Sequence, residues 1–444
     1  MGNYFLAIDQ GTTSTRTVLY DSNFTELDQN QIEITQYYPR PGYVEHDAQE
    51  IWDKTFSTVS SLLEKNGLEA SQIISIGITN QRETIVGWDQ KTGKPIGRAI
   101  VWQDKRTTDY CKTLQNQGVE KEVIEKTGLL LDPYFSASKL RWLNDKFKEE
   151  IVNKNILFGT IDTFLLWKLT KGEVYATDVS NAARTSLFNI STLDWDQDLI
   201  KLFELEKINL PEIKKNADDF GSTTLFGGDI KISGMAGDQQ AALFGQTCFE
   251  AGDIKSTYGT GCFLILNTGN QILRSQNKLL TTIGYKIDQE VVYALEGSIF
   301  IAGALIQWLR DKMKFFISAP ESEGLAKTAN ENSELIIVPS FTGLGAPFWN
   351  PDIKGSIHGI SLDTTQQDII LASLEAIAFQ SKDLIEAIKQ DGAEINSIKI
   401  DGGMANNDFF VQILSDVLDV SVLRPKNIES TALGAAFLAG IGSG

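Results

Sequence analysis

The chain has 444 residues, of which 42% are hydrophobic and 22% are charged, and its formal net charge is −18. This length and composition predict a globular protein of two or three domains. The negative charge argues against nucleic acid or an anionic membrane surface as a partner, whereas an anionic small ligand needs only a local cluster of donors.

Strand-like and helix-like segments alternate along the first half of the chain, which predicts an α/β fold. Asp47–Glu50 has the sequence of a capping box, and the helix that starts there is expected to stop at Gly67. The predicted strands of this half are residues 4–8, 17–21, 31–36, 73–78, 84–88 and 98–102.

The second half begins near residue 252 and repeats the opening pattern of strand, glycine turn and strand. The elements predicted after this hairpin are strand 291–295, a helix near 301–316, strand 335–338, an amphipathic helix from Gln367 to Lys389, strand 397–400 and a further helix. Because both halves open on the same kind of hairpin, we expect a duplicated fold with a ligand cleft between the halves.

The turn of the first hairpin has a composition suited to phosphate. Gly11 lets the backbone approach a ligand closely, and the polar residues around it are Asp9, Thr12, Thr13, Ser14 and Arg16. The hydroxyl residues offer a row of O–H and N–H donors, the arginine adds a cation, and the acid could hold Mg²⁺ through water. Ordinary turn chemistry explains the Asp-Gln-Gly sequence as well.

A second glycine turn, Gly237-Asp238-Gln239, stands at the start of a predicted helix. Asp238 could be a plain N-cap, or the base that takes a proton from an attacking hydroxyl. A helix N-terminus reduces the basicity of a carboxylate. Phosphoryl transfer tolerates this, because its loose transition state needs little nucleophilic push.

Two further glycine turns are Thr257–Gly261 and Asp401–Asn407. The first could lie beside a phosphate chain, although a tight hairpin explains it equally well. The second ends a strand with two glycines before a helix, which leaves room for a flat ring or a phosphate.

Other classes of site find little support in the sequence. The three cysteines are far apart and form no evident disulfide framework, so a reducing cytoplasm is the simplest location. The two histidines are too isolated for a zinc site. No apolar run reaches about 18 residues, so no membrane span is expected.

The glycine turns occur together in the order found in the FGGY family of carbohydrate kinases, which the chain resembles from residue 4 to about residue 440. Asp9–Arg16 is similar to the first phosphate motif of the family, Gly237–Gly245 to the second, and Asp401–Asn407 to the adenosine motif. Two longer segments, Tyr134–Asp145 and Gly355–Glu375, also fit family patterns.

The resemblance implies two actin-like, ribonuclease H-like α/β domains, each with a mixed sheet flanked by helices, and an active-site cleft between them. Residues 1–250 would form the N-terminal domain, with the substrate site, the first phosphate hairpin and the catalytic aspartate. Residues 251–444 would form the nucleotide-binding C-terminal domain. The family pattern continues past the position of Gly444, so this second domain is expected to be short at its C-terminus.

Within the family, Ile78–Thr84 resembles the segment found in glycerol kinases rather than in ketose or gluconate kinases. The resemblance therefore implies ATP- and Mg²⁺-dependent phosphorylation of glycerol to sn-glycerol 3-phosphate, with Asp238 as general base. The residues it places on glycerol are Arg82, Glu83, Trp102, Tyr134, Asp238, Gln239 and Phe263. Those it places on ATP are Thr12, Thr13, Ser14, Arg16, Thr260, Gly303, Gln307, Gly403 and Asn407, with Asp9 (through water) and Asp238 as candidate Mg²⁺ ligands.

Several alternatives stay open at this point. Without the resemblance, Arg82 and Glu83 would be a surface ion pair of little energetic weight, and Trp102 and Phe263 would be core residues. The chain could also be a family kinase for another polyol or a ketose, or a nucleotide-gated binding protein without a phosphoacceptor. A homo-oligomer, either a dimer or a tetramer, is compatible with the resemblance.

Overall fold

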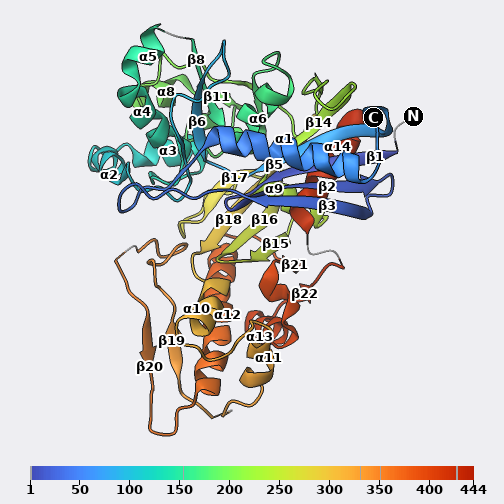
Figure 1. The fold of residues 1–444 in the computed structure, drawn as a ribbon. Helices are drawn as coiled ribbons and strands as arrows, with labels where there is room; N and C mark the ends of the chain where they lie inside the picture. The colour runs from blue at the N-terminus through green and yellow to red at the C-terminus, as the bar shows by residue number, and fades with distance from the viewer. Residues whose placement is uncertain (1–2, 154, 331, 351, 427–428) are drawn as a thin grey trace. The chain divides into compact units, whose positions relative to one another are not determined.

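The computed structural model describes residues 3–153, 155–330, 332–350, 352–426 and 429–444, which form two compact units (Figure 1). Unit 1 consists of Met1–Gly245, Thr282–Val292 and Ser430–Gly444, and unit 2 of Gln246–Thr281 and Tyr293–Glu429. Each unit is built on a mixed sheet with helices beside it, which confirms the predicted α/β class. The last helix of the chain belongs to the same unit as the first strand.

The main sheet of unit 1 has the order β13 (Ser222–Thr223), β14 (Ile230–Gly237), β5 (Ile73–Asn80), β1 (Tyr4–Gln10), β2 (Ser14–Asp21) and β3 (Glu26–Glu33). Strands β1, β2 and β3 form an antiparallel meander, whereas β5 runs parallel to β1 and β14 runs parallel to β5. The predicted first hairpin is therefore confirmed as β1 and β2.

Side chains alternate along β1 and give the sheet two apolar faces, each covered by a helix. Leu6 and Ile8 pack with α1 (Ala48–Lys65), whereas Ala7 between them packs with α14 (Ser430–Ser443). Because successive residues of a strand point to opposite faces, the two helices lie on opposite sides of the sheet. Figure 1 shows α1 in blue and α14 in red beside the first strands.

Close helix packing in unit 1 depends on Gly434 of α14. A methyl group at this position would meet the Ala241 carbonyl oxygen of α9 (Asp238–Gly245) at 1.8 Å. Because the obstacle is backbone, Gly434→Ala is expected to lower the free energy of unfolding by about 3 kcal/mol or more. Thermal unfolding followed by circular dichroism measures the effect.

The control is Gly324→Ala in α11 (Glu321–Ala326), because a methyl group there meets no atom within 4 Å. This change replaces a helical glycine without a clash and is expected to be neutral or to stabilise by up to about 1 kcal/mol. Equal unfolding temperatures for the two variants would show that the contact between α14 and α9 tolerates extra volume.

The rest of unit 1 surrounds a second sheet with the order β4 (Glu45–His46), β7 (Ala99–Ile100), β6 (Ile85–Asp89) and β8 (Ile156–Thr160). Short strand pairs join β10 (Phe188–Asn189) to β11 (Asp194–Trp195), and β12 (Glu212–Lys214) to β9 (Ala176–Asp178). The helices of this region are η1 (Ala70–Gln72), α2 (Thr108–Asn116), α3 (Glu120–Thr127), α4 (Ser136–Lys146), α5 (Lys148–Asn153), α6 (Ile161–Leu169), α7 (Val179–Ala182) and α8 (Gln197–Leu202).

The sheet of unit 2 repeats the topology of unit 1. Its order is β18 (Glu290–Ile299), β16 (Cys262–Gly269), β15 (Asp253–Tyr258), β21 (Ser397–Asp401) and β22 (Val422–Leu423). The first three of these are again antiparallel to their neighbours, although β17 (Leu280–Ile287) intervenes in the chain between β16 and β18, and the last two continue the sheet in parallel. This shared strand order supports the predicted duplication. β17 neighbours β18, and the part of this hairpin formed by Thr282–Val292 belongs to unit 1.

Helices pack on the unit 2 sheet and form its hydrophobic core, with α12 as the longest contributor. They are α10 (Gly303–Asp311), α12 (Gln366–Gln390), η2 (Gly403–Asn406) and α13 (Asp408–Leu418), with the strand pair β19 (Ile336–Val338) and β20 (Ser356–His358) beside them. The predicted helix from Gln367 to Lys389 is thus correct to within one residue at each end.

Some predicted boundaries are wrong for local reasons. The strand expected at 31–36 is β3, which starts at Glu26, because a tight turn anchored by the Asp21 carboxylate sets its register early. The helix expected to reach residue 316 ends at Asp311, and Lys314 beyond it has a left-handed φ of 61°. The strand expected at 98–102 is only two residues long, and β17 was not predicted.

The predicted helix start at residue 47 is only partly a capping box. The Asp47 carboxylate accepts hydrogen bonds from the Gln49 and Glu50 amides, so this residue is an N-cap. The Glu50 carboxylate instead accepts from Thr35 and Lys54 and ties α1 to the chain before it.

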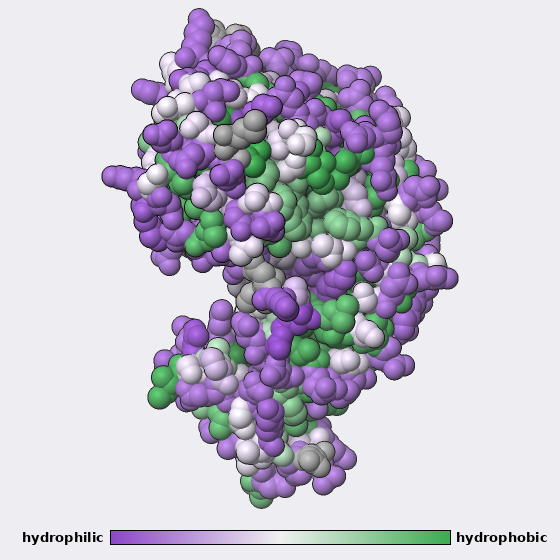
Figure 2. All heavy atoms as spheres, turned by 90° about the vertical axis from the view of Figure 1, so that its right-hand side faces the viewer, coloured by the Kyte–Doolittle hydropathy of each residue, from purple (hydrophilic) through white to green (hydrophobic). Residues whose placement is uncertain are grey.

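Polar side chains cover most of the face drawn in Figure 2, with hydrophobic side chains scattered among them. Across the part of the chain that the structure describes, no helix combines the length and apolar character required to cross a bilayer.

Candidate active site

The turn between β1 and β2 carries an ion pair at its base. Arg16 Nη2 lies 2.7 Å from Asp9 Oδ2, and the two residues are direct partners across the hairpin. At the tip, Thr12 and Ser14 are partly exposed and Thr13 is exposed. The turn therefore presents hydroxyl groups to the outside and holds a cation, paired with Asp9, at its base.

Arg82 and Glu83 follow Gln81 just beyond the end of β5, and both residues are buried, at 2% and 1% exposure. Glu83 has a left-handed φ of 60°, a conformation that costs a non-glycine residue about 1–3 kcal/mol and often occurs at functional sites. The alternative of a surface ion pair is therefore wrong. Arg82 Nε lies 3.2 Å from Asp238 Oδ1 but 3.9 Å from Glu83 Oε1, so Asp238 is the nearer carboxylate.

A continuous series of contacts in unit 1 joins the first turn to Asp238. The Trp102 indole N–H donates to Thr12 Oγ1 at 2.9 Å. The Trp102 and Tyr134 rings meet edge to face, with centroids 5.6 Å apart, and Arg82 Nη2 donates to Tyr134 Oη at 3.4 Å. Together with the ion pair of Arg82 and Asp238, these contacts bring together residues predicted for phosphate, substrate and catalysis.

Asp238 is the first residue of α9, where β14 ends. Its Oδ1 accepts a hydrogen bond from the Gln239 amide at 2.7 Å, and its side chain is 30% exposed. Gln240, two residues after Asp238, is buried, and its Oε1 accepts a hydrogen bond from Arg82 Nη1 at 3.2 Å. Gln240 was not among the predicted site residues, although it supports the same guanidinium group.

A buried polar network holds the backbone just before Asp238. The Gly237 amide donates to Ser180 Oγ at 3.0 Å. Asp178 accepts from the Ser180 amide at 2.7 Å and from Asn216 Nδ2 at 2.8 Å. Burial raises the pKa of Asp178. The network fixes the end of β14 and therefore the position from which Asp238 projects.

Arg184 is a site residue that sequence reasoning missed. It is fully buried, and its Nε donates to Glu83 Oε1 at 2.6 Å. Its guanidinium carbon also lies 5.7 Å from the centroid of the Tyr134 ring and 5.3 Å from that of Phe135. One arginine thus contacts two residues predicted to bind the substrate, and 101 sequence positions separate it from Glu83.

Lys139 fixes the backbone that carries Tyr134. Its ammonium group donates to the carbonyl oxygens of Pro133, Tyr134 and Phe135, at 2.9, 2.5 and 3.1 Å. Burial lowers the pKa of this lysine to about 8. Three carbonyls around one buried ammonium group hold the loop in a single conformation.

His46 is buried beneath the first turn, and this burial makes unfolding depend on pH. Burial lowers its pKa from 6.5 to about 4, against a smaller opposing effect of Glu50. The unfolded chain therefore binds more protons than the folded chain between these values, and stability falls as pH falls from 6.5 toward 4. Between pH 7 and pH 5, we expect the wild type to lose about 2 kcal/mol more of its free energy of unfolding than His46→Phe.

Urea unfolding of both proteins at the two pH values measures this difference. Comparing the wild type with the variant cancels the contributions of all groups that titrate in the same way in both proteins. A constant difference between wild type and variant across the range would contradict the assignment.

In unit 2, the turn after β15 packs directly against the start of α10. The Thr260 carbonyl accepts hydrogen bonds from the Ala302 and Ala304 amides, at 2.9 and 3.0 Å. A methyl group on Gly303 would meet the Gly259 carbonyl oxygen at 2.5 Å, so the contact requires glycine. Gln307 is exposed one helical turn after Gly303 and lies on the same side of α10.

The turn at the end of β21 approaches the same β15 segment. Gly402 has a φ of +86°, and a methyl group there would meet the Tyr258 carbonyl oxygen at 2.5 Å. A methyl group on Gly403, by contrast, would meet nothing within 4 Å. Asn407 caps α13, because its Oδ1 accepts a hydrogen bond from the Phe410 amide at 2.9 Å. The unit 2 residues predicted to bind the nucleotide therefore lie in or beside neighbouring glycine turns, with open space beside Gly403.

Phe263, predicted to contact the substrate, lies in unit 2 on β16 and is partly buried.

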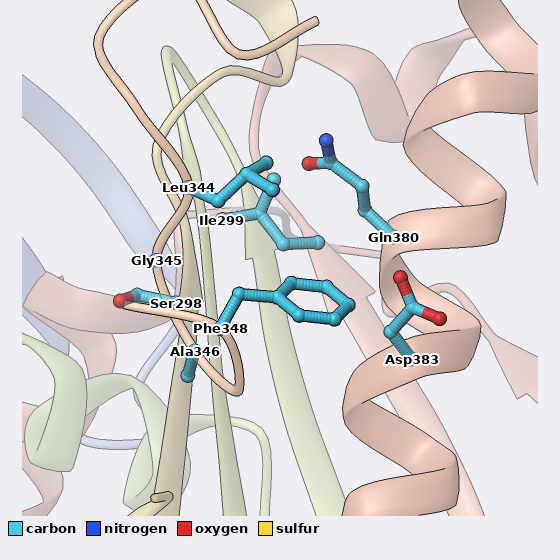
Figure 3. Close-up of a pocket in the computed structure, with 8 residues that line it drawn as sticks. All are labelled: Ser298, Ile299, Leu344, Gly345, Ala346, Phe348, Gln380 and Asp383. Atoms are coloured by element: carbon cyan, nitrogen blue, oxygen red, sulfur yellow. The ribbon is translucent and has the colours of Figure 1, made fainter. Parts of the chain in front are cut away.

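A separate, small recess with a cavity volume of about 10 Å³ lies in unit 2 between α12 and the loop around Ala346. Figure 3 shows the Phe348 ring directed toward Asp383 of the helix. None of the residues that line it belongs to the predicted set, so we do not include the recess in the candidate site.

Comparison with known proteins identifies relatives over nearly the whole chain. The models of the N- and C-terminal domains of the FGGY family of carbohydrate kinases match residues 4–245 and 254–443. A glycerol kinase of Marinomonas sp. (strain MWYL1) is 52% identical over 446 residues, covering 99% of this chain and 90% of the relative.

Solved structures agree with this match. The crystal structure of Plasmodium falciparum glycerol kinase with ADP superposes with a TM-score of 0.93 at 37% identity, covering 99% of this chain and 90% of that chain. A gluconate kinase from Lactobacillus acidophilus has a TM-score of 0.88 at 24% identity, covering 98% and 88%. Kinases whose names give different substrates thus share the fold, so the substrate must be argued from the residues of the site.

Proposed function

This chain belongs to the FGGY family of carbohydrate kinases, and we propose that it transfers the γ-phosphoryl group of ATP to glycerol. The observation that carries the proposal is the series of contacts in unit 1 from Thr12 through Trp102, Tyr134 and Arg82 to Asp238. This series connects the turn that carries Thr12, the aromatic side chains of Trp102 and Tyr134, and the partly exposed carboxylate of Asp238. The 52% identity to a glycerol kinase over nearly the whole chain supports glycerol as the acceptor.

In the proposed reaction, Asp238 is the general base. Its Oδ1 contacts the Arg82 guanidinium at 3.2 Å and the Gln239 amide at 2.7 Å, and these contacts fix the position of the carboxylate. The carboxylate takes the proton of a terminal glycerol hydroxyl while that oxygen forms its bond to the γ-phosphorus. The bond between this phosphorus and the bridging oxygen breaks, ADP leaves, and the products are sn-glycerol 3-phosphate and ADP.

Charged side chains are assigned to the hydroxyl groups of the acceptor, and aromatic side chains to its carbon atoms. Arg82 and Glu83 supply donors and acceptor oxygens for adjacent hydroxyls. The rings of Trp102 and Tyr134 line the carbon face of a small triol and leave little room for a bulkier sugar. Gln239 and Phe263 are assigned as further contacts to glycerol.

We assign polyol binding to residues 1–250 and nucleotide binding mainly to residues 251–444, with domain closure over the reactants to exclude water. The groups assigned to ATP are Thr12, Thr13, Ser14 and Arg16 on its phosphates, and Thr260, Gly303, Gln307, Gly403 and Asn407 around the rest of the nucleotide. The glycine turns of unit 2, with open space beside Gly403, support this assignment.

The carboxylates of Asp9 (through water) and Asp238 are assigned to Mg²⁺. Within the described residues, no three or more acidic, histidine or cysteine side chains gather as a metal cage. Mg²⁺ does not need one, because it commonly keeps several waters and binds one or two carboxylates together with substrate phosphates. Bound with the nucleotide, it would offset the negative charge of the phosphate oxygens.

A coupled assay for ADP, run with a panel of polyols and ketoses, tests the proposal. We expect turnover with glycerol to exceed turnover with four- to six-carbon polyols and with ketoses. Faster turnover with another acceptor would reassign the substrate within the family. Equally fast ATP turnover without any acceptor would favour a nucleotide-gated binding protein.

A further inference from the structure

The turn between β1 and β2 has its carbonyl groups held by hydrogen bonds from the protein. The carbonyl oxygens of Gly11, Thr12, Thr13 and Ser14 all accept hydrogen bonds. The Gly11 carbonyl accepts from Gln10 Nε2 at 2.7 Å and from Gln81 Nε2 at 3.1 Å, and the Thr12 carbonyl accepts from Gln36 Nε2 at 2.8 Å. The Thr13 and Ser14 carbonyls accept from the backbone amides of Ile34 and Gly11, each at 2.9 Å. Side-chain amides thus hold the first two carbonyls.

His46 lies between two of these amides and contacts both of them. Its Nε2 lies 2.8 Å from Gln36 Oε1, and its Nδ1 lies 3.2 Å from Gln81 Nε2. A neutral imidazole that donates from Nε2 and accepts at Nδ1 satisfies both contacts. The Gln36 Oε1 atom then accepts from His46, so the Gln36 NH₂ group faces the Thr12 carbonyl. The Gln81 NH₂ group that faces His46 Nδ1 also donates to the Gly11 carbonyl.

Three members of the cluster are buried, so water cannot replace the bonds among them, whereas Gln36 is partly exposed. His46, Gln10 and Gln81 are exposed by at most 1%. The Gln81 Oε1 atom accepts from Thr84 Oγ1 at 3.1 Å, which leaves its NH₂ group directed to the turn. Every donor in the series thus meets an acceptor, as a buried polar network requires.

We propose that neutral His46 is a positioning residue for nucleotide binding, acting through Gln36 and Gln81 to hold the phosphate-binding turn. In a planar trans peptide, the carbonyl group and the following N–H point in opposite directions. Holding the carbonyls of Gly11 and Thr12 toward the cluster therefore directs the N–H groups of Thr12 and Thr13 away from it, toward the ligand side. Preorganised donors of this kind lose little in reorganisation when an anion binds.

The inference rests on the proposed function, in which this turn binds ATP phosphates, and binding experiments test it without relying on turnover. His46→Phe keeps a flat aromatic ring, somewhat larger than the imidazole, but removes both hydrogen bonds, and Gln36→Leu removes the donor to Thr12 at a partly exposed position. Isothermal titration calorimetry then compares the affinities for Mg²⁺·AMP-PNP and for adenosine, which lacks phosphates. We expect both variants to bind Mg²⁺·AMP-PNP about tenfold more weakly, the effect of losing one well-placed hydrogen bond, with adenosine affinity unchanged.

The matched control is Thr58→Val, because Thr58 is buried in α1 and bonds Thr17 and the Thr55 carbonyl rather than the turn. It is expected to lower stability while leaving both affinities unchanged. Unchanged AMP-PNP affinity in either folded variant, an equal loss of adenosine affinity, or the same selective loss in Thr58→Val would overturn the proposal. If His46→Phe does not fold, Gln36→Leu decides.

Two measurements on the wild-type protein, AMP-PNP binding and glycerol phosphorylation, distinguish a failure of the His46 proposal from a failure of the proposed function. A wild-type protein that binds AMP-PNP but phosphorylates no glycerol contradicts the acceptor assignment alone. A wild-type protein that does not bind AMP-PNP contradicts the nucleotide site and the role of His46 together.

Discussion

Asp238→Asn is expected to lower kcat for glycerol phosphorylation by about 10²-fold or more, because the amide cannot accept the hydroxyl proton. The substitution keeps the size of the side chain and one oxygen that can accept from the Gln239 amide. Glycerol affinity should therefore change much less than kcat. Steady-state kinetics with varied glycerol at saturating ATP measure both quantities.

Asp198→Asn is the matched control for this prediction. Asp198 also stands in the first turn of a helix, α8, and pairs with a cation, Lys126, at 2.7 Å, but its side chain is 78% exposed. It is expected to leave kcat unchanged. If Asp238→Asn retains wild-type kcat, the residue is only a helix-terminal ion-pair partner of Arg82 and another group accepts the proton.

Arg184→Met is expected to lower the free energy of unfolding by about 3–5 kcal/mol, because it leaves the Glu83 carboxylate buried without its 2.6 Å partner. Arg82 Nε is 3.9 Å from Glu83 Oε1 and lies closer, at 3.2 Å, to Asp238 Oδ1. Urea unfolding measures the loss. In the folded fraction, the KM for glycerol should rise far more than the KM for ATP, since Arg184 contacts Glu83 and Tyr134.

The double variant Arg184→Met/Glu83→Gln tests the physical reason for this loss. Removing both charges avoids the buried unpaired carboxylate, so the double variant should recover part of the stability that Arg184→Met loses. A double variant no more stable than the single one would show that lost packing, rather than the charge on Glu83, accounts for the effect.

Local sequence patterns predicted the elements that form the turns of the site. The hairpins at Gly11 and at Gly259 could be located because glycine and hydroxyl residues interrupt strand-type runs. The helix beginning at Asp238 was predicted from the glycine turn before it. These features depend on neighbours in sequence, which is why composition and spacing suffice to find them.

The parts that were not predicted depend on contacts between distant residues. Arg184 meets Glu83 across 101 positions, and His46 meets Gln36 and Gln81 inside the fold. As isolated polar residues, they have no pattern that separates them from surface residues. The packing of α14 on the first sheet is likewise a property of the topology, because a helix with apolar residues all round gives no indication of its partner.

The most direct test of phosphoryl transfer to glycerol is ³¹P NMR of a mixture of the purified protein, ATP, Mg²⁺ and glycerol. We predict equal amounts of ADP and sn-glycerol 3-phosphate, with no inorganic phosphate beyond the level without protein. ADP accompanied by inorganic phosphate, and no phosphorylated glycerol, would contradict this prediction.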